Sequence, residues 1–349
     1  MGYYSNKRVL ITGHTGFKGS WLSVVLLELG ADVYGYALEA EQLSLFRILG
    51  LENHIHSCIA DIRDMESLCS FTIDVNPDII IHMAAQPIVR ESYKKPAYTY
   101  EVNVMGTVNI LEAARKCGNL RSMLNVTTDK VYESNEENLQ LNEEDRLNGY
   151  DPYSNSKSCS ELVTDSYRKS FFKDVAISTA RSGNVIGGGD FSADRIIPDC
   201  ARAAVRNEKV SVRNPTSIRP YQHVLDTLLA YLMIIPAQES NSSLSGAYNI
   251  GPDENGYITT GKLVNLFCTY YGESLAWHTQ SEEYKPHETE ILKLDNKKIK
   301  KVLGWYNRWD IEQAVKQTAV WYKAHASMSD VRDITTRQIA EHGGFAVGK

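Results

Sequence analysis

The sequence predicts an α/β fold, in which a doubly wound parallel sheet is followed by a smaller C-terminal α/β domain. Short apolar segments of strand length alternate with segments whose apolar residues recur at helical spacing, and this alternation is typical of a parallel sheet covered by helices. The first apolar segment leads directly into a glycine-rich turn that opens a helix. With 349 residues, the chain is long enough for two such domains.

The composition is that of an ordinary globular protein, with 43% hydrophobic and 23% charged residues. A net charge of -6 weighs against a nucleic acid or an anionic membrane surface as partner. No apolar run reaches the roughly 18 residues of a membrane span, and the first residues lack a signal-peptide core, so we expect a cytoplasmic protein. The six cysteines are scattered without a CxxC pair, so we expect neither disulfides nor a metal site.

The beginning of the chain carries a candidate dinucleotide site of the Rossmann type. We expect a strand at Lys7–Ile11 and a helix through the apolar residues of Trp21–Leu29. In such a unit the glycines of the turn allow a tight bend, close approach of a pyrophosphate and close helix–strand packing, while the helix N-terminus supplies N–H donors. A purely structural tight turn is the alternative. We expect NAD at this turn, which comprises Gly13, His14, Thr15, Gly16, Phe17, Lys18 and Gly19.

Later strand ends supply further candidate contacts to the cofactor. The second strand, Asp32–Tyr36, has no acidic residue at its end to take the ribose hydroxyls, so NADP is not excluded, and His14 and Lys18 would favour an additional phosphate. Asp61 follows the third strand and is placed to accept from an adenine amino group. The fourth strand, within 77–86, ends in small residues that let a cofactor lie close. The cofactor candidates beyond the turn are Asp61, Ile62, Ala84, Ala85, Gln86 and Asn103.

The stretch Val126–Lys157 carries the candidate catalytic residues. Its first part predicts a strand that ends at a polar Thr-Thr-Asp-Lys break. Tyr153 and Lys157 are four residues apart and therefore face the same side of a helix. A lysine ammonium beside a phenol favours phenolate and would lower the pKa of Tyr153 from about 10 toward neutrality, so that it takes a hydroxyl proton while a hydride leaves the same carbon. Taken alone, such a pair more often belongs to the surface of a helix.

The second half of the chain contains candidate contacts to an anionic substrate. A strand at 175–180 leads into the glycine-rich loop Arg181–Asp190, where the backbone must pass close to something, and Tyr248–Pro252 predicts a late strand of the substrate domain. Three arginines that follow the loop suggest a pyrophosphate clamp, because guanidinium groups match phosphate oxygens; a surface ion pair is the alternative for each. We expect residues 1–180 to form the cofactor domain and 181–349 mainly the substrate domain, with the chain crossing between them.

Together, these motifs resemble the extended short-chain dehydrogenase/reductase family, in its nucleotide-sugar epimerase and dehydratase branch. The resemblance extends from about Lys7 to Tyr322 and implies a homodimer formed through two central helices. The motifs that carry it are the glycine turn, Asp61, Ala84-Ala85, Asn103 and Tyr153-x-x-x-Lys157. The stretches that resemble the CDP-glucose type of 4,6-dehydratase are Gly13–Leu22, Thr127–Tyr132, Asp151–Ser154, Arg181–Asp190 and Arg219–Val224.

This resemblance implies a redox-neutral dehydration of a nucleotide-linked hexose. Tyr153, with Lys157 and a hydrogen bond from Thr128, would remove the O4 proton as the C4 hydride passes to NAD. The related dTDP- and GDP-sugar dehydratases then use an Asp-Glu pair, whereas this chain has Asp129-Lys130. Asp129 is the candidate acid for the departing C6 hydroxyl, and Lys130 is either a neutral base at C5 or a cation that stabilises the enolate. The stored hydride returns to C6. A solvated ion pair is the alternative for Asp129 and Lys130.

The resemblance also implies the substrate contacts, and two departures from the family pattern leave the base and sugar open. Phe191 and Tyr221 stand where the family usually has tryptophan, so GDP- or UDP-linked hexoses stay possible substrates. A 4-epimerase and a non-catalytic dinucleotide-binding module also stay in consideration; the former has no use for Asp129-Lys130, and the intact Tyr153 argues against the latter. The implied substrate-binding residues are Arg181, Asn184, Arg195, Arg213, Arg219, His223 and His287.

Overall fold

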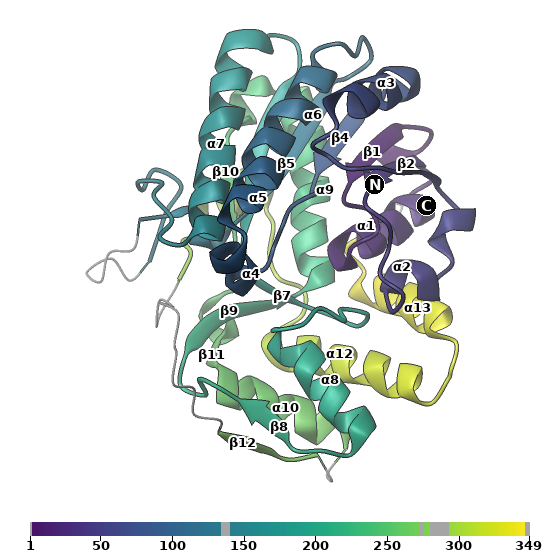
Figure 1. Ribbon diagram of the computed structural model, residues 1–349, viewed down its shortest axis with the longest axis vertical. Helices are drawn as coiled ribbons and strands as arrows, with labels where there is room; N and C mark the ends of the chain where they lie inside the picture. Colours follow the sequence, from purple (N-terminus) through teal and green to yellow (C-terminus); the bar gives the residue numbers. More distant parts are fainter. Residues whose placement is uncertain (1, 134–139, 273–274, 280–292, 346–349) are drawn as a thin grey trace.

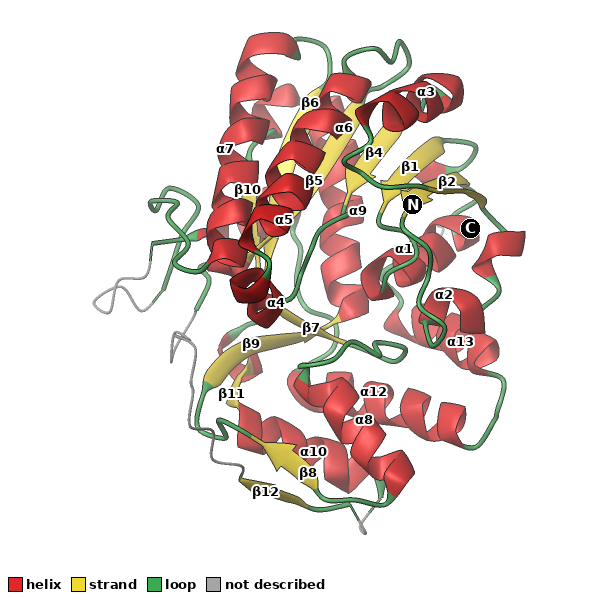
Figure 2. Cartoon of the chain, in the orientation of Figure 1, coloured by secondary structure: helices red, strands yellow, loops and turns green. Residues whose placement is uncertain are grey.

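Seven parallel strands form the central sheet of the structure, a computed structural model that describes residues 2–133, 140–272, 275–279 and 293–345 (Figures 1 and 2). The strand order is β10-β6-β5-β4-β1-β2-β3, with the direction of winding reversing between β1 and β4. These strands are β1 (Arg8–Thr12), β2 (Asp32–Ala37), β3 (His56–Ile59), β4 (Ile79–His82), β5 (Ser122–Thr128), β6 (Ala176–Ser182) and β10 (Ala247–Ile250). The predicted doubly wound sheet is confirmed.

Helices cover both faces of this sheet. On one face α7 packs on β5 and β6, and α6 packs against α3 and α7; on the other, α9 packs on the same two strands and against α1 (Figure 1). The central strands are buried on both sides, which explains why β1 and β4 consist of nearly continuous branched apolar residues. The covering helices are α1 (Phe17–Glu28), α3 (Met65–Val75), α6 (Gly106–Ala114), α7 (Pro152–Phe171) and α9 (Val224–Ser240).

The last strand of the sheet corrects one expectation. The sequence pattern of Tyr248–Pro252 predicts a strand of the substrate domain, but β10 pairs in parallel with β6 and forms the edge of the central sheet. The chain reaches this edge through α9, which crosses the sheet behind β5 and β6. The apolar pattern of a short strand carries no information about its partner, so the domain assignment is wrong although the strand exists. The boundary near residue 180 stays a prediction.

A smaller α/β part lies below the carboxyl edge of the sheet (Figure 2). It holds a three-stranded sheet of order β11-β9-β7 and a two-stranded sheet of β12 and β8. Its strands are β7 (Asn184–Ile186), β8 (Val210–Val212), β9 (Ile218–His223), β11 (Tyr257–Thr259) and β12 (Trp277–Thr279). Its helices are α8 (Ile196–Arg206), α10 (Thr260–Tyr271), α11 (Lys297–Leu303) and α12 (Ile311–Ala326).

The remaining helices connect or cap these layers. The last helix returns to the first domain, where Arg332 donates to the carbonyl of Leu49. These helices are α2 (Leu45–Ile48), α4 (Val89–Lys94), α5 (Pro96–Tyr100), a π-helical turn (Glu101–Met105) and α13 (Val331–His342). Across the described ranges, no helix combines the length and the apolar character that crossing a bilayer requires.

The predicted loop Arg181–Asp190 contains the end of β6 and all of β7, and the three glycines that follow β7 are needed for packing within the protein. A Cβ on Gly188 would lie 2.0 Å from Cγ of the buried Trp321, and one on Gly187 would lie 2.8 Å from a methyl of Val224. Gly189 has a φ of +83°, which side chains rarely adopt, and faces Leu45. The backbone of this loop therefore passes close to a neighbour, as predicted. At these three glycines the neighbour is the hydrophobic core of the protein.

We predict that Gly188→Ala destabilises the protein, because the new methyl group overlaps the ring of Trp321, which α12 holds fully buried. The free energy of unfolding should fall by roughly 1–3 kcal/mol, the usual cost of overpacking a core. Gly118→Ala is the matched control, since a Cβ there meets no atom within 4 Å. Urea unfolding of both variants measures the difference, and equal stabilities would show that the loop can move away from Trp321.

Candidate active site

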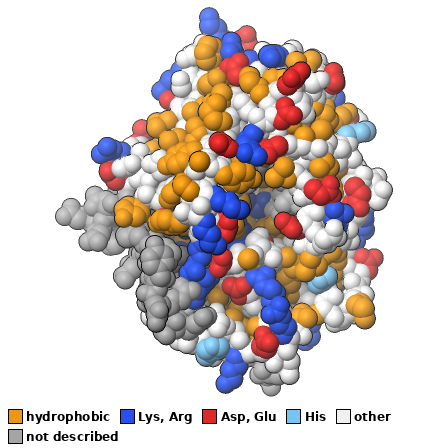
Figure 3. Space-filling view, in the orientation of Figure 1, with side chains coloured by type: hydrophobic (Ala, Val, Ile, Leu, Met, Phe, Trp, Pro, Cys, Tyr) orange, Lys and Arg blue, Asp and Glu red, His pale blue; other side chains and the backbone are white. Residues whose placement is uncertain are grey.

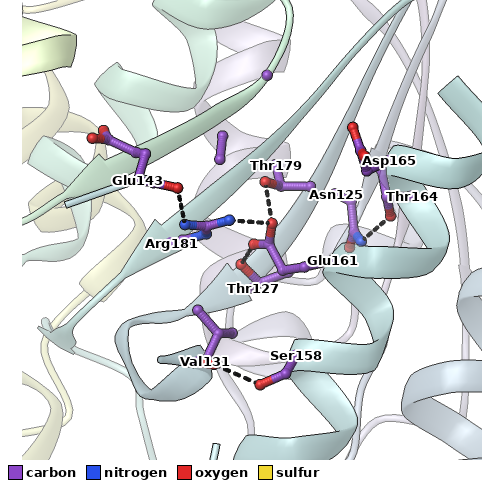
Figure 4. Close-up of polar contacts among 12 residues, drawn as sticks. Asn125, Thr127, Val131, Glu143, Ser158, Glu161, Thr164, Asp165, Thr179 and Arg181 are labelled. Atoms are coloured by element: carbon purple, nitrogen blue, oxygen red, sulfur yellow. Dashed lines mark hydrogen bonds and ion pairs between the residues drawn. The ribbon is translucent and has the colours of Figure 1, made fainter. Parts of the chain in front are cut away.

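The carboxyl end of β5 carries the first group of catalytic candidates. Contrary to expectation, the strand continues through both threonines, and Thr127, Thr128 and Asp129 are all buried. A buried strand can carry these residues because the threonine hydroxyls are paired. Thr127 donates to Glu161 (Figure 4), and Thr128 donates to Asp129 at 3.0 Å. A short 3-10 turn, Asp129–Val131, then takes the chain away from the sheet.

The second group lies at the start of α7. Asp151 caps this helix by accepting from the backbone N–H of Ser154 at 3.0 Å, and Pro152 occupies its first turn, where no backbone donor is needed. The cap fixes where the helix begins and so places Tyr153 and Lys157 in its first two turns. Lys157 is buried, and its ammonium donates to the carbonyl of Val126 on β5 at 3.1 Å.

The electrostatics of the tyrosine–lysine pair differ from the sequence expectation. Burial raises the pKa of Tyr153 to about 12, and the hydrogen bond with Thr128 opposes this only in part. Burial also lowers the pKa of Lys157 to about 8. The pKa of Tyr153 therefore does not fall toward neutrality in the protein alone, because loss of hydration outweighs the hydrogen bond with Thr128 and the charge of Arg195.

The environment of Asp129 favours the protonated form of its carboxyl group. Burial raises its pKa, while Lys130, Thr128 and Arg219 oppose the rise. One carboxyl oxygen accepts from Thr128, and the other, Oδ2, has no hydrogen-bond partner among the described residues. A buried carboxyl with one uncommitted oxygen suits proton donation to a bound group. Lys130 is only partly buried, and its backbone N–H donates to Thr128 at 3.4 Å.

Lys18 of the glycine turn lies closer to the reacting groups than the sequence indicates. Its pKa is lowered to about 7, first by burial and then by repulsion from Arg195 and Lys157, while Asp129 opposes the shift. Its ammonium also lies 6.0 Å from the centroid of the Tyr231 ring on α9. The sequence places Lys18 at the cofactor only. It does not reveal these neighbours because they come from α7, α8, α9 and the end of β5.

The glycine turn has the geometry required to hold a dinucleotide. Gly13 has a φ of +79°, and a Cβ there would lie 2.9 Å from the backbone nitrogen of Ala84. A Cβ on Gly19 would lie 2.2 Å from the carbonyl oxygen of Gly13, so only glycine permits this close approach of helix and turn. Gly16 is the N-cap residue of α1. The first backbone N–H groups of the helix, which have no partner within it, therefore lie at the turn and can donate to a phosphate.

The other cofactor candidates line the same edge of the sheet. Asn103 accepts from the backbone N–H of Gln86 at 2.8 Å and donates to Ser156 on α7 at 2.9 Å, so it braces the loop after β4 against the catalytic helix. Asp61 pairs with Arg63 at 2.8 Å, and hydrogen bonding from Arg63 lowers the pKa of its carboxyl. Their contacts with a cofactor stay predictions.

His14 does not supply the positive charge that is expected beside a phosphate. Its side chain is fully buried, with Nε2 2.7 Å from the hydroxyl of Ser57. Burial lowers its pKa to about 4, so the ring is neutral at pH 7. The ring occupies the space of a side chain on β2, where a Cβ on Gly35 would lie 2.3 Å from its Cγ. His14 therefore packs under the turn rather than facing a ligand.

Two of the predicted substrate contacts are structural residues. Arg181 is buried and forms an ion pair with Glu161 at 3.0 Å, so its guanidinium is not part of a surface clamp. His223 is also buried, between Trp21 and Trp309, and its Nδ1 caps α9 by accepting from the N–H of Leu225 at 3.2 Å. The sequence did not reveal these contacts, because the partners that bury the two side chains are distant in sequence. A contact of either residue with a substrate stays a prediction.

The remaining substrate candidates lie on the side of the smaller domain. Arg195 precedes α8 and pairs with Asp190 at 3.2 Å, and it acts electrostatically on Tyr153 and Lys18. Arg219 is buried on β9 and acts on Asp129, whereas Arg213 pairs with Asp194 at 2.8 Å. Asn184 lies on β7, and His287 lies outside the described residues.

The site combines the glycine turn, the Tyr153–Lys157 pair and the buried Asp129. This combination is typical of nucleotide-sugar enzymes of the short-chain dehydrogenase/reductase type. The family model for GDP-mannose 4,6 dehydratase matches residues 10–318. A CDP-glucose 4,6-dehydratase from Salmonella typhimurium is 42% identical over 97% of both chains. The chain therefore belongs to the GDP-mannose 4,6 dehydratase family, and the resemblance inferred from its motifs is confirmed.

Solved structures show the same fold. A UDP-glucose-4-epimerase from Stenotrophomonas maltophila with bound NAD superposes with a TM-score of 0.80 at 21% identity, covering 93% of this chain and 100% of its own. A dTDP-glucose 4,6-dehydratase from Bacillus anthracis in complex with NAD gives 0.77 at 21% identity, covering 94% and 99%. Epimerases and dehydratases thus share this architecture, and the fold alone does not choose between them.

We predict that the buried His14 makes the protein sensitive to mild acid. Below about pH 6.5 the unfolded chain binds a proton on His14 that the folded chain does not bind until about pH 4, so the free energy of unfolding falls across this window. The loss should approach roughly 3 kcal/mol from this residue. Urea unfolding at several pH values measures it, and His14→Gln should flatten the dependence. His278→Gln, at an exposed ring, is the control; equal profiles for both variants would contradict the prediction.

Proposed function

We propose that this chain is an NAD-dependent 4,6-dehydratase that converts CDP-D-glucose to CDP-4-keto-6-deoxy-D-glucose. The observation that carries the proposal is its 42% identity, over nearly the whole length of both chains, with CDP-glucose 4,6-dehydratase from Salmonella typhimurium. The site supports it, because Asp129 is a buried acid next to Thr128 and Tyr153. A 4-epimerase would have no use for that acid. A GDP- or UDP-linked hexose is the alternative substrate.

In the oxidation half of the reaction, Tyr153 takes the proton of the C4 hydroxyl. Bound NAD supplies the hydride acceptor and a positively charged ring. The residues that would hold it are those of the glycine turn together with Asp61, Asn103 and Lys157. Thr128 lies against the phenol and stabilises its deprotonated form by hydrogen bonding. The high pKa of Tyr153 in the protein means that Lys157 and the bound cofactor must together make the phenolate accessible.

In the elimination half, Asp129 and Lys130 handle protons at C6 and C5. The 4-ketone makes the C5 proton acidic, and Lys130 either removes it or stabilises the resulting enolate. Asp129 protonates the departing hydroxyl at C6, a role that suits a carboxyl whose pKa is raised by burial. The bound cofactor would supply the hydride that C6 receives, while C5 takes up a proton. Arg195, Arg213 and Arg219 would bind the diphosphate of the substrate.

We also propose that the enzyme is a cytoplasmic homodimer that uses NAD rather than NADP. Hydrophobic side chains gather on the face over α5, α6 and α7 (Figure 3), and Leu162 and Phe171 on α7 are exposed. All six cysteines are free thiols, as in proteins of a reducing compartment. The buried, neutral His14 offers nothing to the extra phosphate of NADP.

Incubation with NAD and CDP-, dTDP-, GDP- or UDP-hexoses in deuterated water tests the function. We expect the CDP-glucose sample to lose one water and to gain one solvent deuterium at C5, as detected by mass spectrometry and NMR. The same change with another sugar nucleotide would support the dehydratase mechanism and show that the enzyme prefers that nucleotide to CDP. Retention of the C6 oxygen with inversion at C4 would establish the epimerase instead, and no change in any sample would refute both.

We predict that Asp129→Asn separates the two halves of the reaction. The amide cannot donate the proton that the carboxyl provides, so the elimination should slow by roughly 100-fold or more while C4 oxidation continues. NADH absorbance should then accumulate on the enzyme without keto-deoxysugar. In the wild type the elimination should slow as pH rises, because the acid form of Asp129 is lost. Asp74→Asn, exposed on α3, is the control. Normal turnover of the Asp129→Asn variant would show that Asp129 is not the proton donor in the elimination.

A further inference from the structure

Glu161 continues the line of catalytic residues along α7. It follows Tyr153 by eight residues and Lys157 by four, so the three side chains project from the same side of the helix. Glu161 is only 3% exposed. Its carboxylate accepts from the hydroxyl of Thr127, from that of Thr179 at 2.6 Å and from Arg181 at 3.0 Å, which Figure 4 shows as converging contacts.

Stability alone does not explain this buried ion pair. Removing two charges from water is costly, and apolar replacements of such pairs are often equally stable or more stable. The Arg181 side chain is committed as well, since it donates to the hydroxyl of Tyr132 at 2.9 Å and to the carbonyl of Glu143 at 3.2 Å. The arrangement fixes the position and the charge of Glu161 directly behind the active site.

Glu161 opposes the effect of burial on Lys157. Burial lowers the pKa of Lys157 to about 8, and Glu161 is the group that raises it. Lys18 from α1 and His82 from β4 also act on this neighbourhood. Lys18, whose pKa is lowered to about 7, is either positive or neutral there. His82 is neutral at pH 7, because burial and then Lys157 lower its pKa to about 3. Neither stabilises a positive charge. Among the described residues, Glu161 is therefore the counter-charge of the catalytic lysine.

Glu161 also fixes the strand end that carries the catalytic threonine. Val126 accepts from Lys157, and the next residue, Thr127, donates to Glu161. Two successive residues of β5 are thus tied to two successive turns of α7, immediately before Thr128. A shift of the strand relative to the helix would break both bonds.

We propose that Glu161, held in place by Arg181, is a positioning residue of the dehydratase: it keeps Lys157 in its charged form and fixes Thr128 and Tyr153 relative to each other. The proposal rests on the proposed function, because the charged lysine is needed for the oxidation half. It assigns a role in the reaction to a buried pair that does not touch the substrate.

The test is the pH dependence of the first hydride transfer in Glu161→Gln, measured as NADH formation in a single turnover with CDP-glucose. The amide keeps the shape of the side chain and removes its charge, so Lys157 should lose its proton at lower pH. The alkaline limb of the rate should move down by roughly one pH unit. Thr179→Val is the matched control, since it deletes one hydrogen bond to Glu161 and leaves the charge in place. Its limb should stay at the wild-type pH.

A second readout is independent of turnover. NMR titration of the Lys157 side chain in the cofactor-free protein should show the same downward shift in Glu161→Gln and none in Thr179→Val. If the wild type turns over none of the sugar nucleotides, the proposed function fails while this titration still decides the role of Glu161. Unchanged titrations in both variants would overturn the proposal.

The Glu161→Gln variant leaves the guanidinium of Arg181 buried without its counter-charge, which can prevent folding. If the single variant does not fold, the double variant Glu161→Gln/Arg181→Gln is used in its place, because it removes both charges of the pair together. The same downward shift is expected in this double variant, and a wild-type titration of its Lys157 would overturn the proposal.

Discussion

The active site depends on a polar interface between the end of β5 and the buried side of α7. Helices usually pack on a sheet with apolar residues, but the buried side of α7 consists largely of Ser156, Lys157, Ser160, Glu161 and Thr164. Each must find a hydrogen-bond partner, because an unpaired polar group in a core costs about 1–3 kcal/mol. A slip of the helix along the strand would leave several of them unpaired at once, so the register is fixed far more strictly than apolar contacts would fix it.

This register explains how distant segments form one site. Thr128 and Asp129 leave the sheet where β5 ends, and the cap at Asp151 sets the first turn of α7 opposite them. The loop after β4 reaches the same edge and is tied to α7 through Asn103. Because carboxyl ends of neighbouring parallel strands meet at one edge, the glycine turn after β1 lies there too, which brings Lys18 near Asp129. A ligand held at this edge is therefore surrounded by groups from several βα units.

Much of this arrangement could be predicted from the sequence, because it is local. The glycine turn, the Tyr153–Lys157 spacing and the buried strands each follow from residues close together in the chain. The features that the sequence did not reveal depend on partners that are distant in the chain. Arg181 has the sequence context of a phosphate ligand, but its partner Glu161 lies twenty residues away on another element, and the edge position of β10 follows from pairing with β6. The predicted pKa of Tyr153 differs from that in the structure for a related reason, since desolvation depends on everything that packs around a side chain.

Burial raises the pKa of both proposed proton-transfer groups, with opposite consequences for the two half-reactions. Asp129 must carry a proton to donate one, and burial favours that state. Tyr153 must lose a proton before it can accept one, and burial disfavours that state. The same dry environment therefore prepares the elimination and hinders the oxidation. Hydrogen bonding with Thr128 and the positive charge of Arg195 oppose the hindrance. In the proposed mechanism a charged Lys157 opposes it as well. Burial lowers the pKa of Lys157 to about 8 even with an anion nearby, and Glu161, from the next turn of the helix, is that anion.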